Sequence, residues 1–85
     1  MNTVLNFSEI RKRVEELFRN EFGPNTTVRT DEGWQGRVHA KVVSTAFDGR
    51  SEDEKQEMVW SVLRQHLGSD AQYVSLVLAY GMDEI

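Results

Sequence analysis

A strict alternation of apolar and polar side chains over residues 37–43, RVHAKVV, most constrains how this chain can fold. Val38, Ala40 and Val42 point to one side of an extended chain, and the polar side chains between them point to the other. Such a strand is half-buried, so one face of its sheet needs a covering layer and the other face meets solvent. The rest of the chain must therefore supply that layer.

Two segments have the helical periodicity that the covering layer requires. Residues 6–22 and residues 51–67 each carry an apolar stripe with charged side chains on the opposite side. Ser51 and Glu54 predict a capping box at the start of the second helix. The predicted stripes are Ile10, Val14, Leu17 and Phe18 in the first helix and Met58, Val59, Val62, Leu63 and Leu67 in the second.

Two further segments favour strands. Residues 26–30, TTVRT, are rich in β-branched side chains, and the turn-like residues 31–36, DEGWQG, join them to the alternating strand as a predicted hairpin. Residues 73–80, YVSLVLAY, form the last predicted strand, with Val74, Leu76 and Leu78 on one face and Val77 on the other. This assignment of faces assumes that the alternation runs through the strand without interruption.

The order of elements is therefore helix, strand, strand, helix, strand. It predicts an α+β fold, a two-layer sandwich in which helices cover one face of a three-stranded mixed sheet. A chain of 85 residues with no internal repeat and no linker predicts a single domain over residues 1–85.

The amino-acid composition excludes several kinds of functional site. The chain has no cysteine, which excludes disulfides, thiolate nucleophiles and thiolate metal ligands. Its net charge of -4 argues against strong unspecific binding to nucleic acid. No apolar run reaches membrane-spanning length and no signal-peptide pattern is present, so we expect a cytoplasmic protein. No serine has a base at a suggestive spacing, so we expect no enzyme.

Three phrases resemble the BolA family, whose fold is related to the class II KH domain. The family signature Val-Ser-x-x-Phe-x-Gly matches VVSTAFDG at residues 42–49, and the following apolar helix matches MVWSVLRQHL at residues 58–67. QYVSL at residues 72–76 is similar to the family's last motif, His-Ala-Leu-Ser-Leu. The resemblance implies a non-enzymatic binding or regulatory adaptor. It also implies a monothiol glutaredoxin as partner and a role in iron–sulfur handling and stress-linked regulation of transcription.

The chain departs from the family where the family has metal ligands. The Arg-His-Arg segment of the family is here Lys55, Gln56 and Glu57. The histidine before the last strand falls on Gln72, or on Tyr73 with a shift of one residue, and the DEGWQG loop has neither histidine nor cysteine. In the family these two ligands are implicated in sharing a [2Fe-2S] cluster with the glutaredoxin. We therefore expect no metal ligand and no cofactor held by the chain alone.

The expected partner surface comprises the last strand, the second helix and the DEGWQG loop. Its candidate contact residues are Trp34, Gln72 and Tyr73. One alternative leaves the shared cluster in place with a substitute ligand such as His39.

The other alternative is a KH-like nucleic-acid-binding module that uses Arg29, Arg37 and Lys41 together with Trp34. Phosphate contacts would make its affinity fall steeply with salt. The KH phosphate clamp, Gly-x-x-Gly, would fall at residues 49–52, GRSE, which lack the second glycine and lead into three acidic residues. This segment predicts a self-capped helix start and no phosphate clamp.

Overall fold

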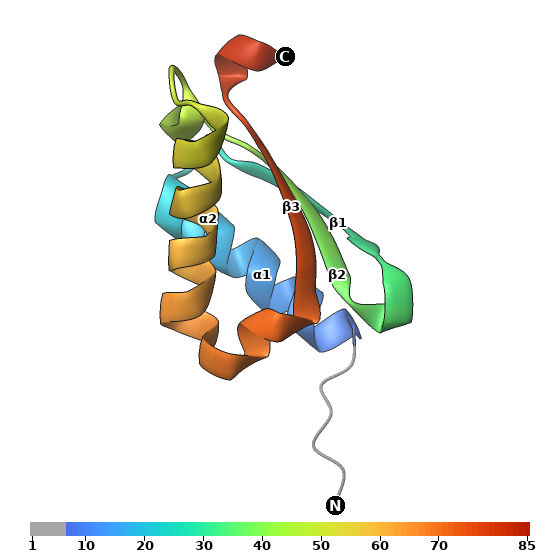
Figure 1. The fold of residues 1–85 in the computed structure, drawn as a ribbon. Helices are drawn as coiled ribbons and strands as arrows, with labels where there is room; N and C mark the ends of the chain where they lie inside the picture. The colour runs from blue at the N-terminus through green and yellow to red at the C-terminus, as the bar shows by residue number, and fades with distance from the viewer. Residues whose placement is uncertain (1–6) are drawn as a thin grey trace, which may run out of the picture.

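The computed structural model describes residues 7–85, and Figure 1 shows how they are arranged. The order helix, strand, strand, helix, strand is confirmed. Residue 6, where the first helix was expected to begin, lies outside the described residues. The main elements are α1 (Phe7–Phe22), β1 (Thr27–Glu32), β2 (Val38–Val43), α2 (Glu52–Leu67) and β3 (Val74–Tyr80).

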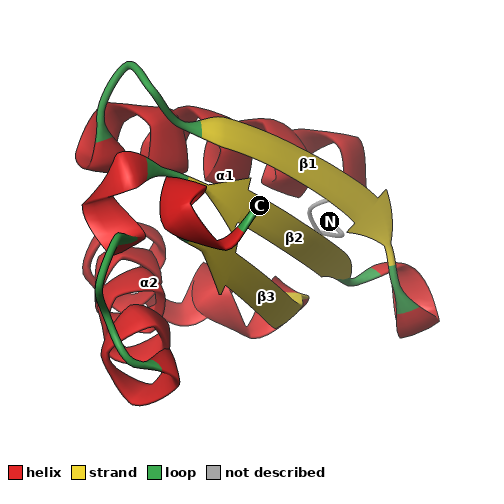
Figure 2. Ribbon diagram, turned by 90° about the horizontal axis from the view of Figure 1, so that it is seen from above, coloured by secondary structure: helices red, strands yellow, loops and turns green. Residues whose placement is uncertain are grey.

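The three strands form one mixed sheet with the order β1-β2-β3. β1 and β2 pair antiparallel from Thr27 opposite Val43 to Glu32 opposite Val38. β2 and β3 pair parallel, and the connection between them is α2. Both helices lie on the same face of the sheet, as Figures 1 and 2 show. The predicted two-layer α+β architecture is therefore confirmed.

The core lies between this helix layer and the inward face of the sheet. The alternation in β2 is confirmed, because Val38, Ala40 and Val42 are all buried. Most of each predicted helix stripe is buried as well, while Leu17, Met58 and Val62 pack at its margin. The buried apolar residues of the helices are Ile10, Val14, Phe18, Val59, Leu63 and Leu67.

The sequence assigned Leu76, Val77 and Leu78 of β3 to the wrong faces of the sheet. Val38 pairs with Val74, but the next residue, His39, pairs with Leu76, so Ser75 is left over as a bulge. One extra residue reverses every later side chain, because the side-chain period of a strand is two. Val77 is thus buried, and Leu76 and Leu78 are 42% and 43% exposed on the face that the helices leave open.

The corner after β2 joins the two layers through the residues of the VVSTAFDG phrase. The buried hydroxyl of Ser44 accepts hydrogen bonds from the Thr26 hydroxyl (3.0 Å) and the Ala46 amide (3.1 Å). It donates to the carbonyl of Phe22 at the end of α1 (3.2 Å). Phe47 is fully buried, with its ring centroid 4.9 Å from that of Phe22. Ser44 and Phe47 of this phrase therefore have structural roles, since they join the sheet to the helix layer.

The bulge makes a prediction about stability. Val77→Ala removes buried methyl groups and is expected to lower the free energy of unfolding by about 2 kcal/mol. Leu78→Ala is the matched control on the open face and is expected to cost less than about 1 kcal/mol. Urea denaturation of both variants measures the difference. A larger loss for Leu78→Ala would contradict the assigned faces.

Candidate functional site

The hairpin tip between β1 and β2 and the start of β3 lie at the same end of the sheet (Figure 1). Trp34 stands shortly before β2, and Gln72 and Tyr73 stand directly before β3. Because β2 and β3 run parallel, their first residues pair, and the three predicted partner residues are brought to one end. Trp34 is 79% exposed, Gln72 is exposed and Tyr73 packs against the core.

The hairpin tip has a hydrogen-bonded backbone of its own. β1 extends to Glu32, so the connection is shorter than the DEGWQG segment that the sequence predicted. Trp34–Gly36 forms a kinked 3₁₀ segment in which Gln35 takes left-handed backbone angles (φ 58°, ψ 31°). The amide of Gly33 donates to the Arg37 carbonyl (2.6 Å), and the Arg37 amide donates to the Trp34 carbonyl (3.2 Å). The Trp34 indole is therefore presented to solvent on an ordered turn.

His39 lies against the backbone of this tip. A Cβ atom added to Gly33 would lie 2.3 Å from Nε2 of His39 and 2.6 Å from Cδ2. Since that space is filled by the imidazole ring, Gly33 is needed here for close approach, and its φ of -95° is ordinary. His39 thus lies beside the DEGWQG loop, the segment for which the resemblance in sequence implies a ligand.

The donor set at this end does not fit a shared iron–sulfur cluster of the kind the resemblance implies. Gln72 and Tyr73 offer an amide and a phenol, which are poor ligands for iron in a thiolate-rich cluster. His39 is the one imidazole that residues 31–39 and 72–76 contribute. Within residues 7–85 no three histidine, cysteine or carboxylate side chains come together as a metal site.

Only part of the predicted cationic group comes together on the open face. Arg29 of β1 lies directly opposite Lys41 of β2. Arg37 lies at the hairpin tip, and the Asp31–His39 pair stands between it and the other two cations. Of the three cations named for the nucleic-acid alternative, β-pairing brings Arg29 and Lys41 side by side.

The loop before α2 has its amide groups occupied. The amide of Gly49 donates to Oδ2 of Asp83 (3.0 Å), and that of Arg50 donates to the Phe47 carbonyl (3.1 Å). The predicted capping box is present, with the Ser51 amide donating to Oε1 of Glu54 (2.9 Å). This hydrogen bond lowers the pKa of the Glu54 carboxyl. A phosphate would find these donors taken by the chain's own acceptors.

Lys55 holds the C-terminal turn, Met82–Glu84, against the first turn of α2. Its side chain is 1% exposed, and Nζ lies 2.8 Å from Oε2 of Glu52 and 2.7 Å from Oε1 of Glu84. The hydrogen bonds to Glu52 and then to Glu84 raise the pKa of Lys55. The bond from Lys55, followed by one from the Gly81 amide, lowers the pKa of Glu84. Sequence reasoning missed this clamp because Glu84 lies far away in the chain.

Gln56 is the residue that the resemblance in sequence aligns with the central histidine of the family's Arg-His-Arg segment. Its side-chain amide donates to the carbonyl of Val77 on the free edge of β3 (2.9 Å), and its oxygen accepts from Nε1 of Trp60 (3.1 Å). A strand edge with unpaired backbone groups invites aggregation, and this bond covers part of it. Gln56 is therefore a structural residue here.

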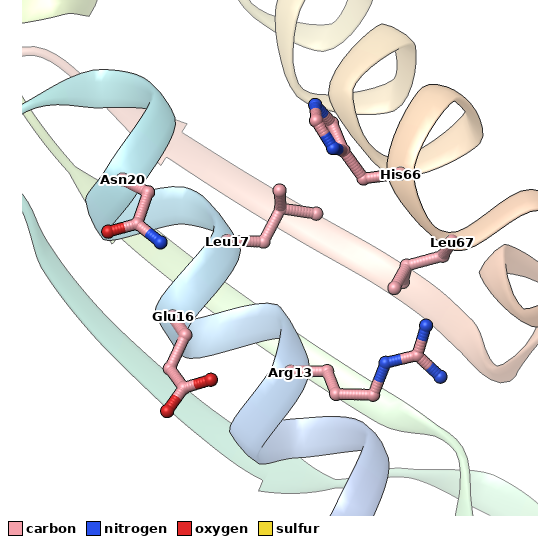
Figure 3. Close-up of a pocket in the computed structure, with 6 residues that line it drawn as sticks. All are labelled: Arg13, Glu16, Leu17, Asn20, His66 and Leu67. Atoms are coloured by element: carbon pink, nitrogen blue, oxygen red, sulfur yellow. The ribbon is translucent and has the colours of Figure 1, made fainter.

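A shallow, open pocket of about 230 Å³ lies between α1 and α2 (Figure 3). Its two basic side chains already have acidic partners. Arg13 bonds Asp70 (3.0 Å), and Nε2 of His66 lies 3.4 Å from Oε2 of Glu21. The other lining residues are Glu16, Leu17, Asn20 and Leu67. Since both basic side chains already contact carboxylates of the chain, this pocket offers no strong recognition of an anionic ligand.

Comparison with solved structures identifies the architecture. The BolA domain of SufE1 from Arabidopsis thaliana superposes with a TM-score of 0.68 at 19% identity, covering 87% of this chain and 93% of that one. BolA1 from Arabidopsis thaliana superposes with a TM-score of 0.71 at 16% identity, covering 96% and 99%. The chain has the BolA fold. No family model and no curated protein matches its sequence. Within the described residues, no helix is long and apolar enough to span a membrane.

The contact between His39 and Gly33 makes a prediction. Gly33→Ala forces the imidazole out of its position and is expected to lower the urea midpoint of unfolding. In a His39→Ala background the space is vacant, so the same substitution is expected to cost less. A double-mutant cycle by urea denaturation measures the coupling. If the two substitutions change the stability additively, the imidazole ring does not contact Gly33, which would contradict the structure.

The Lys55 clamp makes a prediction about pH. Because the folded-state pKa of Glu84 is lowered, its stabilisation is present above the ordinary glutamate pKa and is lost as pH falls through the folded value. Glu84→Gln is expected to lower Tm at neutral pH, and the gap to the wild type closes in acid. Glu57→Gln, which removes only an exposed pair with Arg64, is the control and is expected to change Tm little. A gap that persists unchanged in acid would refute the clamp.

Proposed function

We propose that this chain is a non-enzymatic BolA-like adaptor that binds a monothiol glutaredoxin without supplying cluster ligands. The proposal is supported mainly by the arrangement at one end of the sheet, where the hairpin tip and the start of β3 lie together. There an exposed Trp34 stands on a hydrogen-bonded turn at the same end as Gln72 and Tyr73. Exposed tryptophans are enriched among residues that dominate binding energy.

The partner class rests on the resemblance in sequence and on the shared BolA fold. The chain retains the phrases that build the fold and has neither histidine nor cysteine at the positions that match the family's two ligands. A chain of this kind keeps a protein-binding surface and loses the means to hold metal. A regulatory role in iron–sulfur handling, in the cytoplasm and linked to stress and transcription, belongs to the same proposal.

The nucleic-acid alternative has weaker support. It rests on Arg29 and Lys41, which lie side by side on the open face. Against it stand the occupied amides at residues 49–51, the separation of Arg37 and the net charge of -4. Two adjacent cations neutralise few phosphates, so such binding would be weak and lost at moderate salt.

The test is binding to a purified monothiol glutaredoxin by calorimetry, followed by a visible spectrum of the anaerobically co-purified pair. We expect a complex to form. Its visible spectrum either matches that of the glutaredoxin's own cluster or shows no cluster absorption. Trp34→Ala is expected to weaken binding about tenfold, the scale of a moderate interface hot spot. Lys12→Ala, a truncation on the exposed side of α1, is the control and is expected to leave binding unchanged.

Two outcomes would contradict this proposal differently. Absence of any complex would remove the glutaredoxin as partner. A new absorption spectrum that is lost in His39→Ala would restore cluster sharing with a substitute ligand.

A further inference from the structure

The open face of the sheet combines exposed leucines with two cations. Beyond the bulge, β3 turns Leu76 and Leu78 away from the helices, and both are more than two-fifths exposed. The registers place Leu76 beside His39 and Leu78 beside Lys41. Lys41 in turn faces Arg29 on β1. An apolar strip on β3 therefore borders a cationic strip on β1 and β2.

The two cations on this face lack carboxylate partners. Within residues 7–85, neither Arg29 nor Lys41 has an acidic group within 4.0 Å, although the chain carries 14 acidic residues against 10 lysines and arginines. Like charges directly opposite on paired strands destabilise a sheet. Lys41 instead lies over the ring of Tyr80, with Nζ 5.4 Å from the ring centroid. Carboxylates of a binding partner would therefore complement the charges of Arg29 and Lys41.

The arrangement argues against a second copy of this chain as the occupant. The cations lie in the middle row of the face, between the Asp31–His39–Leu76 row and the Thr27–Val43–Tyr80 row. Stacking two such faces about a two-fold axis through their centre would bring Lys41 against Lys41. Symmetry would thus repeat the unfavourable charge pair.

Nucleic acid also fits this face poorly. Aliphatic Leu76 and Leu78 offer no ring for base stacking and no charge for phosphate. Asp31 at the end of the cationic strip repels phosphates and carboxylates alike, so it confines any acidic contact to Arg29 and Lys41. A peptide segment that carries both leucine-like and acidic side chains complements both strips at once.

We propose that the open face of the sheet, defined by Arg29, Lys41, Leu76 and Leu78, docks an acidic amphipathic segment of a partner protein. Carboxylates of that segment lie over Arg29 and Lys41, and its apolar side chains cover the two leucines. This interaction does not depend on the glutaredoxin interaction, because it uses a different surface from the hairpin tip.

The test is a titration of the ¹⁵N-labelled chain, followed by amide chemical shifts, with a short helical peptide of leucine and glutamate. The same peptide with lysine in place of glutamate is the first control, and oligothymidine is the second. We expect the acidic peptide to bind and to shift amides of β2 and β3. Lys41→Glu is expected to weaken this binding about tenfold, the effect of losing a close charge pair.

Lys12→Glu makes the same charge change on the exposed side of α1 and is expected to leave binding unchanged. Leu78→Ser tests the apolar strip and is expected to weaken binding while the fold is retained. Equal binding of both peptides, shifts confined to the helices, or preferential binding of oligothymidine would each overturn the proposal. None of these results depends on glutaredoxin binding, so the two proposals fail separately.

Discussion

The pairing of β2 with β3 fixes which side chains this protein shows to solvent. The strands run parallel, and one residue of β3 is left over where Val74 gives way to Leu76. Without that bulge, strict alternation would send Leu76 and Leu78 into the core and Val77 outwards. With it, the core closes over Val77 and Ala79, and the leucines border the cations of the open face. Both the core and the proposed docking surface depend on this single residue.

The residues that carry the resemblance to the BolA family serve the fold. Ser44 connects β2 to the end of α1, and Phe47 fills the core below that corner. At the same end of the molecule, Lys55 ties α2 to the C-terminal turn through Glu84. These contacts and the capping box occupy the backbone amides of residues 49–51 and the buried Lys55 at that end. Binding of a partner is therefore more reasonable at the opposite end, where Trp34 is exposed and bonded only through its backbone.

The sequence predicted the layers well because periodicity reports burial directly. The stripes of both helices, the alternation of β2 and the capping box at Ser51 follow from local spacing. The faces of β3 did not, because a bulge depends on pairing with another strand. The burial of Lys55 was also invisible, since its partner Glu84 lies 29 residues away. In the candidate site, the contact of His39 with Gly33 was not anticipated, because it depends on how the hairpin tip folds back on β2.

The claim that the hairpin tip and the start of β3 form the partner surface is tested most directly by mapping the interface. The ¹⁵N-labelled chain is titrated with unlabelled monothiol glutaredoxin, and the amide and indole signals are followed. The account predicts that the largest changes fall on Trp34, Gln72 and Tyr73. Changes centred on α1, or on the loop before α2, would contradict it.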